Sequence, residues 1–131
     1  NYLKSKEIKI FGSDYPSKDG TAIRDYIHVV DLALAHIYAA NYLNKNKSSL
    51  VLNCGYGHGY SVKEVIDSFN SLNKKKLPYS YSKRRMGDIF SLVADNQSIK
   101  KKIGWKPKYD SLRKILKSSI DWEKKIKKNN F

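Results

Sequence analysis

Short β-prone segments alternate with helix-patterned segments along this chain, and this alternation limits the possible folds more than any other feature. The strand-like segments are residues 8–11, 24–29, 50–53 and 79–82. The segments with apolar residues at helical spacing are 31–43, 61–72, 95–103 and 110–126. Such alternation is typical of an α/β domain. The 131 residues contain no internal repeat, so we expect a single domain over 1–131 with flexible ends at 1–7 and 127–131.

Local capping signals mark the expected helices. Asp31 precedes a mostly apolar segment, so we expect its carboxylate to cap a deeply buried helix that runs to about Leu43. Ser61-Val-Lys-Glu64 fits a capping box, and Asp95 is the expected cap of a short helix that stops at Gly104. The inward-facing residues of the last two helices are expected to be Ile99, Ile103, Leu112, Ile115, Leu116 and Ile126.

A glycine-rich turn at Gly55, Gly57 and Gly59 partly fits a dinucleotide-binding loop. Its spacing is G-x-G-x-G rather than G-x-G-x-x-G, and no acidic residue ends a second strand about 20 residues on. We therefore interpret these glycines as a tight strand-to-helix turn and expect no cofactor there.

Two Y-x-x-x-K pairs, Tyr2/Lys6 and Tyr79/Lys83, match the spacing of a tyrosine–lysine acid/base pair. That chemistry needs both side chains on one helix face. The second pair lies in a strand-like segment, which would separate its members by about 13 Å. We assign a catalytic role to neither pair.

No metal site is expected, because His28, His36 and His58 lack metal-ligand spacing with Cys54 or the carboxylates. Cys54 is the lone cysteine, so an internal disulfide is excluded. No signal peptide opens the chain, and no apolar run is long enough to cross a bilayer, so we expect a cytoplasmic protein with no membrane partner. Because Asn1 rather than methionine comes first, we expect the chain to be part of something larger.

The formal net charge of +14 raises the alternative of a free-standing basic module that binds nucleic acid or another polyanion. Most of the excess is lysine spread along the chain, whereas arginine, the usual reader of bases and phosphates, occurs four times. We interpret the lysines as solvated surface and do not expect nucleic acid as a partner.

Arg24, Arg85 and Asp88 form the constellation with the clearest chemistry. Two arginines can grip a pyrophosphate through paired charge-assisted hydrogen bonds, and a nearby carboxylate can accept hydrogen bonds from ribose hydroxyls. An ordinary Arg–Asp surface pair is the competing interpretation of the same residues.

A family resemblance supports the functional interpretation. Ile10-Phe-Gly-Ser-Asp-Tyr-Pro-Ser-Lys-Asp-Gly-Thr21 and Arg24-Asp-Tyr-Ile-His-Val-Val-Asp-Leu-Ala33 strongly resemble the UDP-glucose 4-epimerases, members of the extended short-chain dehydrogenase/reductase group. Residues 52–62, Arg84-Arg-Met-Gly-Asp88 and Ile103-Gly-Trp-Lys-Pro107 match in the same order. The resemblance covers residues 8–126 and implies the small C-terminal substrate-binding domain of that group.

The resemblance implies a role for each matching residue. Phe11, with the backbone of Lys9 and Ile10, matches the strand end that packs against uracil. Arg24 matches the arginine that contacts the diphosphate.

The second half of the implied site lies further along the chain. Arg85 matches the other diphosphate-binding arginine, and Asp88 matches the carboxylate that holds the ribose. Leu92 falls where side-chain size influences whether an N-acetylated sugar fits.

The N-terminal Rossmann half of this family, with its NAD loop and its catalytic serine, tyrosine and lysine, has no counterpart in these 131 residues. We therefore expect the chain to supply the UDP-sugar grip for UDP-galactose/UDP-glucose interconversion in galactose metabolism, but to hold no catalytic residue, bind no NAD and be inactive alone. The expected partners are a UDP-sugar and either the missing Rossmann half or a homodimer partner. A non-functional remnant of a truncated gene is a further alternative.

Overall fold

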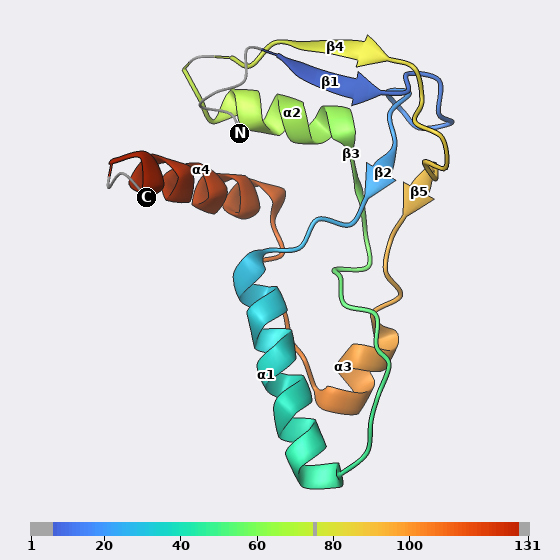
Figure 1. Ribbon diagram of the computed structural model, residues 1–131, viewed down its shortest axis with the longest axis vertical. Coiled ribbons are helices and arrows are strands. Elements are labelled where there is room, and N and C mark those ends of the chain that lie inside the picture. The colour runs from blue at the N-terminus through green and yellow to red at the C-terminus, as the bar shows by residue number, and fades with distance from the viewer. Residues whose placement is uncertain (1–6, 75, 129–131) are drawn as a thin grey trace.

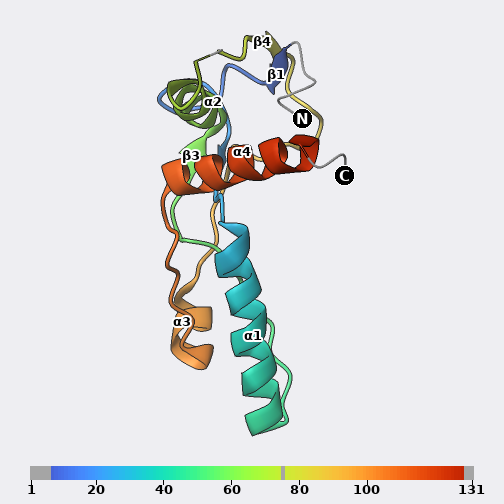
Figure 2. The same ribbon diagram turned by 90° about the vertical axis from the view of Figure 1, so that its left-hand side faces the viewer.

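The computed structural model describes residues 7–74 and 76–128, and they form two regions with different make-up. The short strands, α2 and α4 lie at one end, and α1 extends away from them with α3 alongside (Figure 1). Figure 2 shows the same division, with α4 lying crosswise to α1 below α2. The elements in chain order are β1 (Ile8–Phe11), β2 (Ile23–Arg24), α1 (Val29–Asn46), β3 (Tyr60–Ser61), α2 (Val62–Ser71), β4 (Tyr79–Ser82), β5 (Ser91–Leu92), α3 (Gln97–Ile103) and α4 (Leu112–Lys128).

The strands form two small sheets. β1 and β4 pair in parallel, with Ile8 opposite Tyr79 and Phe11 opposite Ser82, and both match the predicted ranges 8–11 and 79–82. The second sheet has the order β3-β2-β5, in which β2 is antiparallel to β3 and parallel to β5. The α/β fold class is thus confirmed, although the predicted strand at 24–29 is wrong beyond Arg24 because both neighbours of β2 are two residues long.

The start of α1 differs from the prediction. The helix begins at Val29, and Nδ1 of His28 caps it by accepting a hydrogen bond from the Val30 amide at 3.1 Å. Asp31 lies inside the first turn, where its fully buried carboxylate accepts hydrogen bonds from the Tyr56 hydroxyl and two distant backbone amides. Asp31 is therefore a buried connector rather than a cap. The helix also continues past Leu43 to Asn46.

Most of α1 is not deeply buried, contrary to the prediction. Only Asp31 and Ala35 are buried, whereas Val29 and Ile37 are 70% and 55% exposed. Residues 50–53 form no strand, since no strand of the described chain pairs with them, and Val51 is 98% exposed. Both segments have the apolar residues on which the prediction rested, but no described element covers Val29, Ile37 or Val51.

The buried cluster of the α1–α3 region consists of Ala35, Tyr56, Ile99 and Trp105. The indole N–H of Trp105 donates to the Asp31 carbonyl at 3.0 Å, which joins the cluster to the first turn of α1. As predicted, Ile99 is buried, Ile103 packs against the cluster, and Gly104 ends α3 in a left-handed conformation with φ of 70°.

The predicted Asp95 cap is wrong by one residue, because Asn96 occupies the N-cap position of α3. The Asp95 carboxylate still accepts a hydrogen bond from the Gln97 amide at 3.0 Å, so the prediction located the start of α3 to within one residue.

The α2–α4 pair closes the other end. Ser61 and Glu64 form the predicted capping box at the start of α2, and Ile66 is buried on its inner face. α4 begins at Leu112, two residues after the predicted start, and buries Leu112 and Ile120; Ile115, Leu116 and Ile126 are half-buried.

The predicted flexible ends fall mostly outside the described residues, and Lys127 and Lys128 complete α4. In the ranges the structure covers, no helix combines the length and apolar character needed to cross a membrane.

Candidate functional site

The fold brings Arg24, Arg85 and Asp88 together. Arg24 ends β2, whereas Arg85 and Asp88 flank a tight turn between β4 and β5, with Gly87 at a φ of 81°. Asp88 lies between the two guanidinium groups: Oδ1 accepts from Arg24 Nη2 at 3.5 Å, and Oδ2 accepts from Arg85 Nε at 3.0 Å. Asp88 thus joins Arg24, 64 positions earlier in the sequence, to Arg85, three positions earlier. The trio carries a net charge of +1.

The two arginines are held differently. Nη1 of Arg24 donates to its neighbouring Ile23 carbonyl at 2.7 Å, and its side chain is only 26% exposed. The Arg85 side chain is 63% exposed, and within residues 7–74 and 76–128 its terminal Nη groups have no hydrogen-bond partner. Because a guanidinium offers five N–H donors, most of the capacity of Arg85 is free for an anion. Arg24 is thus a fixed donor and Arg85 an adjustable one.

Phe11 belongs to the same group. It ends β1 and is 36% exposed, and the guanidinium carbon of Arg85 lies 4.8 Å from the centre of its ring. This distance fits a cation–π contact, which orients the arginine over the ring.

Lys9 and Ile10 were predicted to contribute their backbone to the site, but only Lys9 has its backbone groups on the free edge of β1. Ile10 is 1% exposed, so its side chain belongs to the core. The Ile8 amide donates to the carbonyl of Pro78, just before β4, and the Gly12 amide donates to that of Ser82 in β4. Because backbone groups alternate along a strand, Ile10 also faces β4, and the backbone groups of Lys9 and Phe11 face the opposite edge.

Leu92 lies beside Arg24, because the two residues are direct partners in the β2–β5 pairing. It is 58% exposed and lines a hollow of about 480 Å³. The other residues that line this hollow are Arg24, Asp25, Leu52, Asn53, Cys54, Val93 and Ala94.

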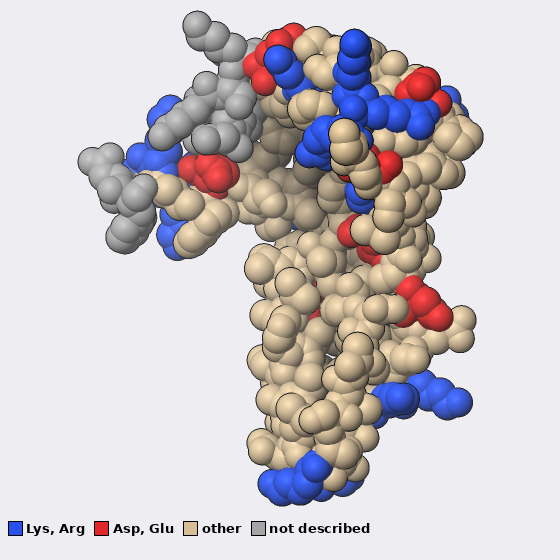
Figure 3. All heavy atoms as spheres, turned by 45° about the vertical axis from the view of Figure 1, so that its right-hand side comes forward, with Lys and Arg blue, Asp and Glu red and all other residues tan. Residues whose placement is uncertain are grey.

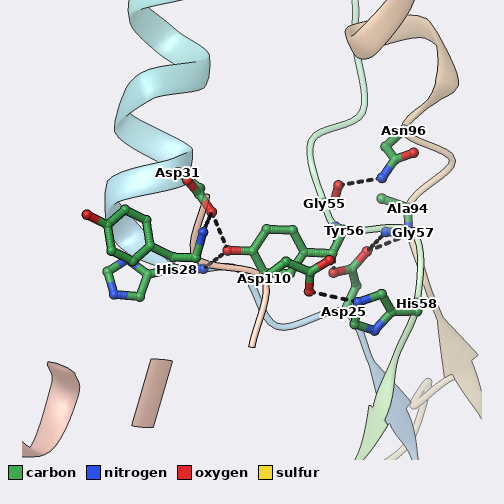
Figure 4. Close-up of polar contacts among 11 residues, drawn as sticks. Asp25, His28, Asp31, Gly55, Tyr56, Gly57, His58, Ala94, Asn96 and Asp110 are labelled. Atoms are coloured by element: carbon green, nitrogen blue, oxygen red, sulfur yellow. Dashed lines mark hydrogen bonds and ion pairs between the residues drawn. The ribbon is translucent and has the colours of Figure 1, made fainter. Parts of the chain in front are cut away.

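Sequence reasoning missed Asp25, whose carboxylate accepts hydrogen bonds from the backbone amides of Tyr56, Gly57 and Ala94 (Figure 4). The available sequence signal was the glycine at position 55. In the structure, a Cβ at Gly55 would lie 2.5 Å from the Asp25 carboxylate, so only glycine leaves room for it. The turn itself is confirmed, with Gly57 at a φ of 81°, but it follows an irregular segment instead of a strand.

The neighbouring arginine, Arg84, faces the other way. Its Nε and Nη2 donate to the side chain and carbonyl of Asp14, both at 2.7 Å, and its guanidinium lies 4.0 Å from the centre of the Tyr15 ring. The hydrogen bond from Arg84 lowers the pKa of Asp14 below its ordinary value. Arg84 therefore secures the loop of residues 12–20, while Arg85 points into the candidate site.

The histidines and the described tyrosine–lysine pair have other positions in the fold. Tyr79 is on strand β4, so Tyr79 and Lys83 do not share a helix face, and Tyr2/Lys6 lies outside the described residues. His28 caps α1, and His58 pairs with Asp110 at 2.8 Å. Across the described ranges no group of three or more potential metal ligands occurs.

The charged side chains are unevenly distributed. On the face in Figure 3, lysine and arginine gather at the strand-bearing end, mixed with acidic groups, and again at the far tip, with a mostly uncharged stretch between them. A continuous basic track, of the kind that follows a nucleic-acid backbone, is not visible on this face.

Comparison with known proteins supplies an independent finding. The model of the GDP-mannose 4,6 dehydratase family matches residues 1–118. The UDP-glucose 4-epimerase of Azospirillum brasilense is 43% identical over 122 residues, which is 93% of this chain and 35% of that protein.

Solved structures agree with the fold. The UDP-Glc/GlcNAc 4-epimerase of Campylobacter jejuni matches with a TM-score of 0.84 and 46% identity, over 94% of this chain and 37% of that one. The UDP-glucose 4-epimerase of Bifidobacterium longum, in complex with NAD+ and UDP, matches with a TM-score of 0.85 and 40% identity, over 93% and 36%. The chain thus spans about a third of the length of these relatives and corresponds to a C-terminal part of them.

Proposed function

The chain belongs to the GDP-mannose 4,6 dehydratase family, and from its similarity to UDP-glucose 4-epimerases we propose that it is the UDP-sugar-binding part of such an enzyme. The observation that carries the proposal is the carboxylate of Asp88 held between Arg24 and Arg85, with Phe11 against Arg85. A fixed and an adjustable guanidinium beside an aromatic ring suit a base linked to a diphosphate.

Each group has a distinct task in this proposal. Arg24 and Arg85 donate to the two phosphates, and the +1 charge of the trio offsets part of the diphosphate charge. Asp88 accepts hydrogen bonds from the ribose hydroxyls while it orients both arginines.

The remaining residues bind the two ends of the ligand. Phe11 covers the uracil, and the free edge of β1 at Lys9 and Phe11 offers backbone hydrogen bonds to the base. Leu92 limits the room for the sugar in the hollow beside Arg24.

NAD does not fit the only glycine-rich turn of this chain. The amides of Tyr56 and Gly57, which would face a phosphate in a cofactor loop, donate to Asp25 instead. Hydride chemistry thus belongs to the remainder of a complete enzyme. We expect no epimerisation when the chain alone is incubated with UDP-galactose and NAD; measurable turnover would contradict this assignment.

The proposed partner is the N-terminal half that the longer relatives carry. The exposed apolar residues of α1 and the unpaired segment at 50–53 leave a face open for it, since an uncovered apolar surface favours association. A second copy of the chain is the alternative occupant.

We also place the protein in the cytoplasm, because its lone cysteine has no second cysteine in the chain to pair with.

UDP affinity should be low. Each charge-assisted hydrogen bond contributes about 1.5–3 kcal/mol, and association itself costs several kcal/mol, so we expect a Kd of about 1 mM or weaker. Chemical shifts of ¹⁵N-labelled protein titrated with UDP measure it. Arg24→Ala and Arg85→Ala should abolish the shifts. Arg113→Ala, which removes the same charge from the exposed side of α4, is the matched control and should preserve them.

The competing function, binding of a polyanion through the +14 charge, predicts a different result. A basic module would bind duplex DNA with a steep salt dependence and would be displaced by DNA but not by UDP. DNA binding that survives Arg24→Ala and Arg85→Ala, without any UDP response, would favour that alternative.

A further inference from the structure

Asp25 directly follows β2, where the backbone hydrogen bonds of the β3-β2-β5 sheet end. β2 ends at Arg24, and its partners β3 and β5 are each two residues long. The last backbone bond toward β5 runs from the Asp25 amide to the Leu92 carbonyl at 3.2 Å. Beyond it, nothing in the ladder holds the neighbouring segments to the end of β2.

The Asp25 side chain continues the connection on both sides. Oδ1 accepts the Tyr56 amide at 2.9 Å, and Oδ2 accepts the amides of Gly57 at 3.0 Å and Ala94 at 3.3 Å. Tyr56 and Gly57 lie shortly before β3, and Ala94 lies two residues after Leu92, so one carboxylate joins three segments (Figure 4). Gly55 leaves the space for this carboxylate, because a Cβ there would lie 2.5 Å from Oδ2.

We propose that Asp25 is a positioning residue for the nucleotide site: it ties the glycine-rich turn and the segment after β5 to the end of β2, and so fixes Arg24 and Leu92 relative to each other. The inference rests on the proposed function. Asp25 lines the same hollow as Arg24 and Leu92, and the hydrogen bonds of its carboxylate go to backbone amides rather than to a guanidinium.

Charge distinguishes this role from a direct electrostatic one. A carboxylate in the wall of an anion site repels the anion, so its neutralisation by Asp25→Asn would, through charge alone, strengthen UDP binding. A positioning role predicts the opposite, because the asparagine amide cannot accept all three backbone N–H groups and the joined segments would separate.

The test is a UDP titration of the full ¹⁵N-labelled chain, with the Arg24 side-chain Nε–H signal as a second readout. We expect Asp25→Asn to raise the Kd for UDP about tenfold and to move the Arg24 signal before UDP is added. Gly55→Ala should weaken UDP binding similarly with no change in charge, because its methyl displaces the carboxylate.

Asp31→Asn is the matched control. Asp31 also accepts from three donors and the substitution makes the same change in charge, but none of those donors, the Tyr56 hydroxyl and the amides of Lys108 and Tyr109, lines the hollow. It should lower stability while leaving the Kd within about twofold.

The outcomes separate the two proposals. If the wild type binds UDP and both Asp25→Asn and Gly55→Ala bind it equally well, the positioning role is wrong while the site stands. An equal loss of affinity in Asp31→Asn would also overturn it. If the wild type gives no UDP response, the proposed function itself is overturned.

Discussion

Replacing Asp31 by asparagine should destabilise this protein more than any other single carboxylate-to-amide change. The side chain has 0% exposure, and it accepts hydrogen bonds from the Tyr56 hydroxyl at 2.7 Å and from the amides of Lys108 and Tyr109 at 2.9 and 2.8 Å. These donors join the start of α1 to the glycine-rich turn and to the segment before α4. An amide oxygen can serve two of them, so one donor is left facing an NH₂ group.

The magnitude follows from these contacts. A buried donor without a partner costs about 1–3 kcal/mol, and the loss of charge assistance at the other two adds about 1 kcal/mol. We expect a loss of about 3 kcal/mol, which corresponds to a fall in Tm of about 10 °C for a chain of this size.

Urea unfolding followed by circular dichroism measures the free energy of unfolding directly. The control is Asp121→Asn, the same chemical change at an exposed position of α4, which should stay within about 0.5 kcal/mol of the wild type. If Asp31→Asn also stays within about 0.5 kcal/mol, the carboxylate does not hold the three segments together.

Two further predictions concern stability. Burial raises the pKa of Asp31, but hydrogen bonds from Lys108, Tyr56 and Tyr109 outweigh this effect, so the pKa lies below the ordinary 3.8. The contribution of this carboxylate to the free energy of unfolding is therefore present above the unfolded pKa, and it is lost as the pH falls through the folded pKa. A urea series from pH 5 to pH 2 should show less acid loss in Asp31→Asn, and identical slopes would contradict this. Ser61→Ala removes both the cap of α2 and a hydrogen bond to Asp19. It should lower the free energy of unfolding by about 1–2 kcal/mol. An unchanged urea midpoint would show that the capping box contributes nothing to stability.

Local patterns predicted those elements whose cause is local. The capping box at Ser61 and the left-handed stop at Gly104 depend on a few neighbouring residues, and both formed as expected. Asp31 shows the limit of such patterns. An aspartate before an apolar segment fits a helix cap equally well whether its carboxylate turns to the helix or to donors 77 and 78 residues away, so sequence spacing could not distinguish the two.

Longer-range pairing explains the other differences. Residues 50–53 have the composition of a strand, but a strand needs a neighbour, and none lies beside it in the described chain. The apolar pattern of α1 likewise predicts that something should cover the helix without saying what. Residue chemistry suggested the grouping of Arg24, Arg85 and Asp88, and family resemblance favoured it over an ordinary surface pair. Sequence spacing could not establish that the three meet, because their meeting depends on the parallel pairing of β2 with β5.

We propose that Arg24, Arg85 and Asp88 together hold a uridine diphosphate, and a crystal structure of the chain grown with UDP would show this. We expect phosphate oxygens within hydrogen-bond distance of both guanidinium groups, ribose hydroxyls on Asp88 and uracil beside Phe11. UDP bound at another surface, with the Arg24–Asp88–Arg85 contacts undisturbed, would overturn the assignment.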